Sequence, residues 1–138
     1  MNVRLLSLSL IAATGLAGCG PSEPPAPPPP PPTEVAAVKT PPPQYPLELA
    51  CMGVGGTSTF KVTIGTDGKP SEVALLTGAG NPQLDELAKT AVQGWQLKAA
   101  TRNGAAVPAT IQVPVSFNPP QPKPDQCFAI EERLRRGG

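Results

Sequence analysis

The 138-residue chain contains no histidine. This absence removes both the most common metal ligand and the most common general base of enzymes. An excess of charge of one sign is also absent: 11 basic residues stand against 10 acidic ones, or 10 against 10 without Arg4. Such a balance predicts no strongly basic face, which argues against nucleic acid as a partner.

The remaining polar residues do not form a recognisable catalytic or metal site. Asp85 and Glu86 are adjacent on a predicted helix, so they point about 100° apart and cannot act as a facing pair. Asp67 belongs to a turn without other acidic residues, which leaves calcium too few oxygen ligands. Ser58 and Ser71 have no histidine partner. We therefore expect no enzyme, no metal, no cofactor and no small-molecule substrate.

Proline, by contrast, is abundant. The 21 prolines gather mainly in two blocks, and about 75 residues between them can form one small globular domain with a marginal core. We expect four regions: a signal peptide at 1–18, a lipidated cysteine with a proline-rich linker at 19–44, a domain at 45–118, and a proline-rich tail with a short basic helix at 119–138.

The first residues predict export and attachment to a membrane. A short basic region is followed by an apolar run, 5–16, that is too short to span a bilayer as a mature helix. It ends in Leu-Ala-Gly-Cys, which resembles the lipobox of bacterial lipoproteins, in which the cysteine, here Cys19, carries the lipid. Because Gly20 is not aspartate, the sorting rule of that class favours the outer membrane. The alternative is an ordinary secretory signal with an incidental cysteine.

The linker is almost pure proline over residues 24–32. Proline fixes φ and has no N–H for a ladder, so this segment should be an extended polyproline II rod. At ~3.1 Å per residue, the segment over 20–44 could hold the domain roughly 75 Å from a membrane. The alternative to a spacer is a ligand for a proline-binding module.

The clearest periodic pattern predicts one long helix after Asn81. Its apolar residues repeat at the spacing of one helical face. They are Leu84, Leu87, Ala88, Ala91, Val92 and Trp95. Asn81 can cap the first turn, and Pro82 suits the first helical position because the N–H that it lacks would be unpaired there. Gly94 ends the run, which places Trp95 outside the helix.

Alternating apolar residues predict strands at 57–64, 71–77 and 107–117. The side chains expected to face the core are Phe60, Val62, Ile64, Val73, Leu75, Ile111, Val113, Val115 and Phe117. A turn with Gly68 at positive φ joins the first two strands. With a short helix at 47–52, the order is helix, strand, strand, helix, strand. This order predicts an α+β fold with a three-stranded antiparallel sheet, the first strand in the middle, the last strand at an edge, and the long helix on one face.

Six short motifs in one order resemble the C-terminal domain of the TonB energy-transducer family. They are Tyr45-Pro46, the glycines over 53–56, Asp67-Gly68, GNPQLD at 80–85, Trp95 with Leu97, and VPVSF at 113–117. Each motif is weak alone, but together they cover about 75 residues in register. A proline-rich region before the domain is also similar to that family.

Two features depart from the family pattern. TonB proteins are anchored by an uncleaved transmembrane helix, and a histidine on that helix helps to couple them to a proton-driven motor in the inner membrane. This chain has a lipobox in place of the helix and contains no histidine. The resemblance therefore implies a TonB-like binding domain on a lipoprotein, without energy transduction of its own.

The resemblance also implies a binding site on the last strand. In the family, an extended segment of an outer-membrane receptor pairs with this strand by β-augmentation. Proline is tolerated in an edge strand only where its missing N–H would face the open side. The free backbone groups should therefore belong to the residues that, like Pro114, stand at even-numbered positions: Thr110, Gln112 and Ser116. The alternative is that this parity only protects an edge from aggregation.

The cysteine count predicts a disulfide. If Cys19 carries lipid, Cys51 and Cys127 form an even pair in an oxidising compartment. A bridge between them would close a loop of more than 70 residues, for which the chain-entropy model gives roughly 4 kcal/mol. The alternative is two free, buried thiols. If the bridge forms, residues 121–136 are tied back onto the domain, across or beside the edge strand.

Two functions are compatible with these features. The first is a periplasm-facing, lipid-anchored module that captures an extended segment of an outer-membrane receptor, transporter or secretion component. The second is a structural lipoprotein in a cell-envelope assembly, in which the same edge pairs permanently with a neighbour.

Overall fold

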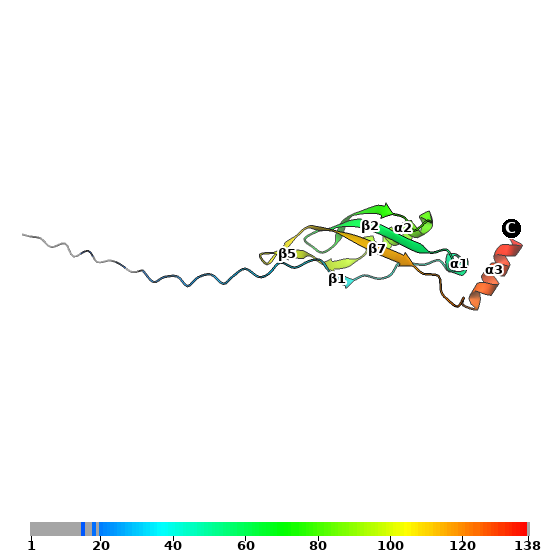
Figure 1. The fold of residues 1–138 in the computed structure, drawn as a ribbon, viewed down its shortest axis with the longest axis horizontal. Coiled ribbons are helices and arrows are strands. Elements are labelled where there is room, and N and C mark those ends of the chain that lie inside the picture. Colours follow the sequence, from blue (N-terminus) through cyan, green and yellow to red (C-terminus); the bar gives the residue numbers. More distant parts are fainter. Residues whose placement is uncertain (1–14, 16–17, 19, 138) are drawn as a thin grey trace, which may run out of the picture.

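The part of the chain that the structure describes is elongated (Figure 1). The computed structural model describes Gly15, Gly18 and residues 20–137. The predicted lipidation site, Cys19, and all of the predicted signal peptide except those two glycines lie outside the described residues. The N-terminal segment extends from one end of the domain, and the C-terminal helix lies at the other (Figure 1). No helix in the described part is long and apolar enough to cross a membrane.

Ten elements follow one another within residues 20–137. The helices are α1 (Leu47–Cys51), α2 (Pro82–Gln93) and α3 (Gln126–Arg136). The strands are β1 (Ala36–Lys39), β2 (Gly56–Ile64), β3 (Pro70–Thr77), β4 (Gln96–Lys98), β5 (Ala100–Arg102), β6 (Ala105–Val107) and β7 (Ala109–Phe117). The predicted α+β fold is confirmed, with β2, β3 and β7 as its three main strands.

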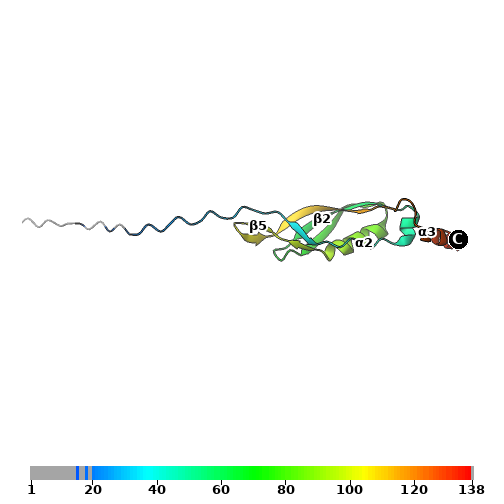
Figure 2. The same ribbon diagram turned by 90° about the horizontal axis from the view of Figure 1, so that it is seen from below.

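The long helix α2 begins and ends where its sequence predicts. The Asn81 side-chain oxygen accepts hydrogen bonds from the backbone N–H groups of Gln83 (2.9 Å) and Leu84 (3.3 Å). Gly94 ends the helix, and Trp95 lies beyond it. Leu84, Ala88 and Val92 are fully buried, and the helix covers one side of the sheet (Figure 2). The 3.6-residue apolar period therefore identified the face that builds the core.

The main sheet has the antiparallel order β3-β2-β7, with β2 in the middle. Phe60, Val62 and Ile64 of β2 are fully buried against α2. On β3, Val73 packs on this core, but Leu75 is 47% exposed. The prediction that Leu75 faces inward is therefore wrong. β3 is an outer strand, and its register with β2 shifts beside Leu75, where Thr59 pairs with Thr77 and Phe60 pairs with Leu75.

The first part of the predicted linker, residues 20–32, is exposed and forms no helix or strand. From Thr33 onward the chain lies on the domain: Thr33 bridges to Thr101, and β1 pairs with β4. The sequence gives no sign of this contact, because the four residues of β1 are all exposed and so show no alternation. The folded unit therefore includes residues before position 45.

Candidate functional site

Strand β7 is an outer strand with one free backbone edge. All nine of its residues pair with β2, from Ala109 opposite Ile64 to Phe117 opposite Gly56. Within residues 20–137, no second strand pairs with β7, and no backbone–backbone hydrogen bond joins it to another segment. A nine-residue edge is therefore open for pairing with another extended chain.

The position of Pro114 determines which groups point to the free edge. Pro114 lies opposite Thr59, and because proline has no N–H, this pair cannot be a hydrogen-bonded pair of the ladder. The bonds to β2 therefore come from the odd-numbered residues of β7, and the even-numbered residues direct their backbone groups outward. The structure brings Thr110, Gln112, Pro114 and Ser116 together along this edge with exposed side chains. Their role in binding stays a prediction.

The opposite face of β7 is fixed in the core. Val113, Val115 and Phe117 are at most 8% exposed. The ring of Tyr45 packs edge-on against Phe117 with 5.3 Å between the ring centroids, and the Tyr45 hydroxyl donates a 2.7 Å hydrogen bond to the Val54 carbonyl oxygen. Burial raises the pKa of Tyr45 above its ordinary value of 10.0. The strand is therefore held in place before any partner arrives.

Hydroxyl groups cover the exposed face of the sheet beside the edge. The Thr57 and Ser116 hydroxyls lie 2.9 Å apart across β2 and β7, and those of Thr63 and Thr110 lie 3.4 Å apart. A pocket of about 230 Å³ lies on this face. Its lining residues are Lys61, Thr63, Glu72, Ala74 and Thr110. The surface next to the edge is thus polar and carries one basic and one acidic side chain.

A buried hydrogen-bond network joins α2 to the middle strand. Ser58 is fully buried and donates a 2.6 Å hydrogen bond to Oδ1 of Asp85. The same carboxylate oxygen accepts a 2.8 Å hydrogen bond from the backbone N–H of Ala79. Gly56 lies so close to this loop that a Cβ there would collide with the Ala79 carbonyl oxygen. Asp85 therefore has a structural role, and the close approach of the Ala79 carbonyl explains why a glycine stands where β2 begins.

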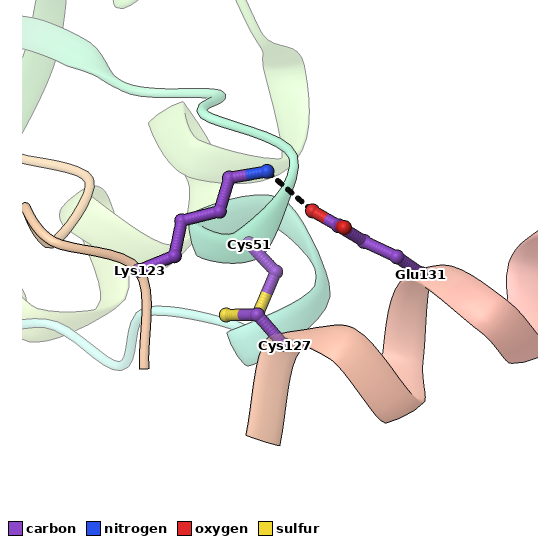
Figure 3. The surroundings of a disulfide bond; sticks show 4 residues. All are labelled: Cys51, Lys123, Cys127 and Glu131. Atoms are coloured by element: carbon purple, nitrogen blue, oxygen red, sulfur yellow. Dashed lines mark hydrogen bonds and ion pairs between the residues drawn. A yellow bond between two sulfur atoms is a disulfide. The ribbon is translucent and has the colours of Figure 1, made fainter. Parts of the chain in front are cut away.

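Cys51 and Cys127 are joined by a disulfide, with their Cα atoms 5.2 Å apart (Figure 3). Both cysteines are fully buried and form a small second core with Ile130 and Leu47. Lys123 and Glu131 form an ion pair beside the bridge. The disulfide holds α3 against α1, beyond the end of β7 in both views (Figures 1 and 2). The tail therefore does not cover the edge strand, contrary to the expectation that it lies across or beside it.

The other polar candidates take part in local contacts. Asp67 accepts a hydrogen bond from the backbone N–H of Lys69 within the β2–β3 turn, and the Ser71 hydroxyl donates to the Thr63 carbonyl oxygen. Among the residues that the structure describes, no three histidine, cysteine, aspartate or glutamate side chains are grouped so that they could hold a metal ion. The edge of β7 is therefore the feature that the geometry singles out.

A second set of contacts was not found from the sequence. Arg102 forms a 3.1 Å ion pair with Glu34 and donates a hydrogen bond to the Thr33 carbonyl oxygen. The Trp95 indole N–H donates a 3.0 Å hydrogen bond to the Pro41 carbonyl oxygen. The partners in each contact are far apart in the sequence. The apolar pattern placed Trp95 just beyond the helix, and no other feature of the sequence indicated these contacts.

Comparisons with known proteins give matches of three kinds. The family model described as "Gram-negative bacterial TonB protein C-terminal" matches residues 41–119. Protein tonB2 of Pseudomonas aeruginosa is 32% identical over 77 residues, which cover 56% of this chain and 28% of that protein. The solution NMR structure of the Pseudomonas aeruginosa TonB CTD has a TM-score of 0.50 and 20% identity, covering 66% of this chain and 90% of that one. The structural comparison supports the fold alone.

Proposed function

The chain belongs to the TonB C-terminal family, and from this membership we propose that it binds an extended segment of a protein partner by strand addition to β7. The partner is an outer-membrane receptor, transporter or secretion component. The observation that carries the proposal is the free edge of β7, which is held rigidly on its other side by β2. In β-augmentation, main-chain hydrogen bonds supply affinity and side-chain contacts supply selectivity.

The edge offers a limited set of hydrogen-bonding groups. The free donors are the N–H groups of Thr110, Gln112 and Ser116, and the acceptors are the carbonyl groups of the same residues and of Pro114. Because Pro114 interrupts the donors, a partner strand can make fewer bonds than on an uninterrupted edge. The side chains on the polar face then contribute a larger share of the selectivity.

The proposed location of this module is the periplasmic face of the cell envelope, with a lipid on Cys19 as its anchor. The support is the Leu-Ala-Gly-Cys sequence at 16–19 and the proline-rich segment that follows it. Without a histidine, the chain lacks the residue through which TonB proteins couple to a motor. We therefore propose that the module captures its partner and does not itself transmit energy.

Site-specific photocrosslinking in cells tests the proposal. A photoreactive residue at Gln112 is expected to capture an outer-membrane protein through an extended segment. The matched control is Glu86, which is also exposed but lies on α2, the helix that covers the opposite face of the sheet. Equal capture from both positions, or capture from Glu86 alone, would contradict binding at β7. Crosslinking from Gln112 whose yield is not reduced by free peptide of the captured segment, added to isolated envelopes before irradiation, would favour a permanent structural partner.

A further inference from the structure

We propose that residues 33–44, called the strap below, form a releasable part of the tether. In the docked state the strap is folded onto the domain. In the released state it extends the linker while the β2, β3 and β7 sheet stays intact. The consequence of release, a longer reach of the domain, depends on the proposed lipid anchor. The docking and release of the strap are properties of the chain itself.

The strap is attached at several separate points along its length. Thr33 and Thr101 exchange two backbone hydrogen bonds (3.1 and 2.9 Å), and their hydroxyls lie 2.8 Å apart. Val35 is partly buried against the main core. Ala36 and Ala37 pair with Lys98 and Leu97 of β4. Further on, Pro41 accepts the hydrogen bond from Trp95, described above. An extended, proline-flanked segment of the chain therefore adds a strand to its own domain.

These attachments are weak compared with the main sheet. The four residues of β1 are exposed, with Val38 at 69%, so the strap buries little apolar surface. The Glu34–Arg102 ion pair is also exposed, at 81% and 48% of the two side chains, and such pairs contribute little and are screened by salt. By contrast, β2 and β7 share nine residue pairs over a buried core. Segments with few buried contacts open locally at a lower free energy than the whole fold.

Release of the strap would change the length of the tether. With the strap docked, the free tether after Cys19 is residues 20–32, or roughly 40 Å at ~3.1 Å per residue. With the strap released, residues 20–44 reach roughly 75 Å. Tension on the anchored end acts first on Thr33, the outermost attachment. With the strap docked, the domain would therefore stay within a short distance of its anchor. With the strap released, it could follow a bound partner that moves away.

Hydrogen exchange of the full chain in detergent micelles tests the proposal, with paired substitutions at two valines. Val35→Asp places a charge against the core, whereas Val38→Asp places the same charge at an exposed position of the same strap. In the unaltered protein, the Thr33 and Thr101 amides should be protected but exchange about tenfold or more faster than those of Phe60 and Val113. Val35→Asp should abolish the protection of the first pair only, and Val38→Asp should leave both pairs unchanged.

Fluorescence of Trp95, the single tryptophan of the chain, supplies a second readout. Its emission should move to longer wavelength in Val35→Asp and stay unchanged in Val38→Asp, because release exposes the indole to water. The proposal is overturned if the Thr33 and Thr101 amides exchange together with the Phe60 and Val113 amides, if they are unprotected in the unaltered protein, or if Val35→Asp also unfolds the sheet. A failure of partner binding at β7 would leave all these results unchanged.

Discussion

At the scale of single residues, Asp85 connects two elements through one oxygen atom. Oδ1 accepts hydrogen bonds from the buried Ser58 hydroxyl and from the Ala79 backbone. Hydrogen bonds to a charged group contribute about 1.5–3 kcal/mol, and a buried donor left without a partner costs about 1–3 kcal/mol. This carboxylate stabilises the start of α2 against β2, although its sequence pattern suggested only a helix-surface residue.

We therefore predict that Asp85→Ala lowers the free energy of unfolding by about 2–3 kcal/mol. Asp85→Asn keeps an acceptor oxygen in the same place and should cost clearly less. Urea denaturation of both variants measures the difference. Equal destabilisation by Ala and Asn would show that the charge, and not the two hydrogen bonds, is what matters at this position.

Tyr45 gives the domain a defined response to alkaline pH. Its pKa is raised above 10.0 by burial, so the folded state holds the phenolic proton more tightly than the unfolded chain does. This contribution is fully present below pH 10.0 and is lost as pH rises through the folded pKa. Tyr45→Phe should lower stability by about 1 kcal/mol at neutral pH, because the Val54 carbonyl loses its donor, and the difference from the unaltered protein should shrink above pH 10.0.

Tyr45 is the single tyrosine of the chain, so its ionisation can be followed directly by ultraviolet absorbance. The titration midpoint should lie above 10.0 in the folded protein and return toward that value in denaturant. A midpoint that is the same in both conditions would contradict the burial of the hydroxyl beside Val54.

At the scale of elements, the edge of β7 is tested by removing one more backbone donor. Gln112→Pro deletes an N–H that points away from β2, so the fold should tolerate it. We predict about tenfold weaker binding of the partner segment, since one backbone hydrogen bond is lost. Gln112→Ala is the matched control, because it removes the side chain and keeps the N–H. Calorimetric titration of both variants gives the comparison, and equal losses would assign the contact to the side chain instead.

Elements with a strong periodic pattern were predictable, and those without one were not. The spacing of Leu84, Ala88 and Val92 identified α2, and the alternation through Phe60 and Val62 identified β2. In contrast, β1 and β4 have four and three residues, too few for a period to be recognised. Their pairing joins residues about 60 positions apart, such as Ala37 with Leu97, which no local pattern encodes.

The parity of the residues along the β7 edge could also be inferred from a local feature. Pro114 restricts the geometry of its strand locally, so its parity could be inferred without knowledge of the rest of the fold. The exposure of Thr110, Gln112 and Ser116 follows from the same period of two. The place of α3 could not be inferred, because a disulfide between Cys51 and Cys127 says which residues meet but not on which side of the sheet the tail lies.

At the scale of the whole molecule, the disulfide fixes the end that lies opposite the proposed anchor. It links residues 76 positions apart, for which the chain-entropy model gives about 4.5 kcal/mol. We predict that the double variant Cys51→Ala with Cys127→Ala unfolds at a lower urea concentration, by an amount of this order. Because α3 lies away from β7, the double variant should still bind the partner segment under conditions in which it is folded. Loss of binding by a folded double variant would contradict this separation.

The overall arrangement places three features along one axis. The tether extends from one end, the open strand edge lies along the middle, and the disulfide-linked helix closes the other end (Figure 1). The family match covers the middle part, residues 41–119. Most of the strap, residues 33–40, and the helix α3 lie outside this match, and neither pairs with the edge of β7 within residues 20–137.

The most direct measurement is the exchange rate of single backbone amides along β7, with and without the partner segment. In the free protein, the amides of Thr110, Gln112 and Ser116 should exchange rapidly, and those of Ile111, Val113 and Val115 should be protected by β2. Addition of the segment should slow the first three and leave the others as they were. If the first three are already protected in the free protein, or stay fast when the partner is bound, β7 is not the strand on which the partner pairs.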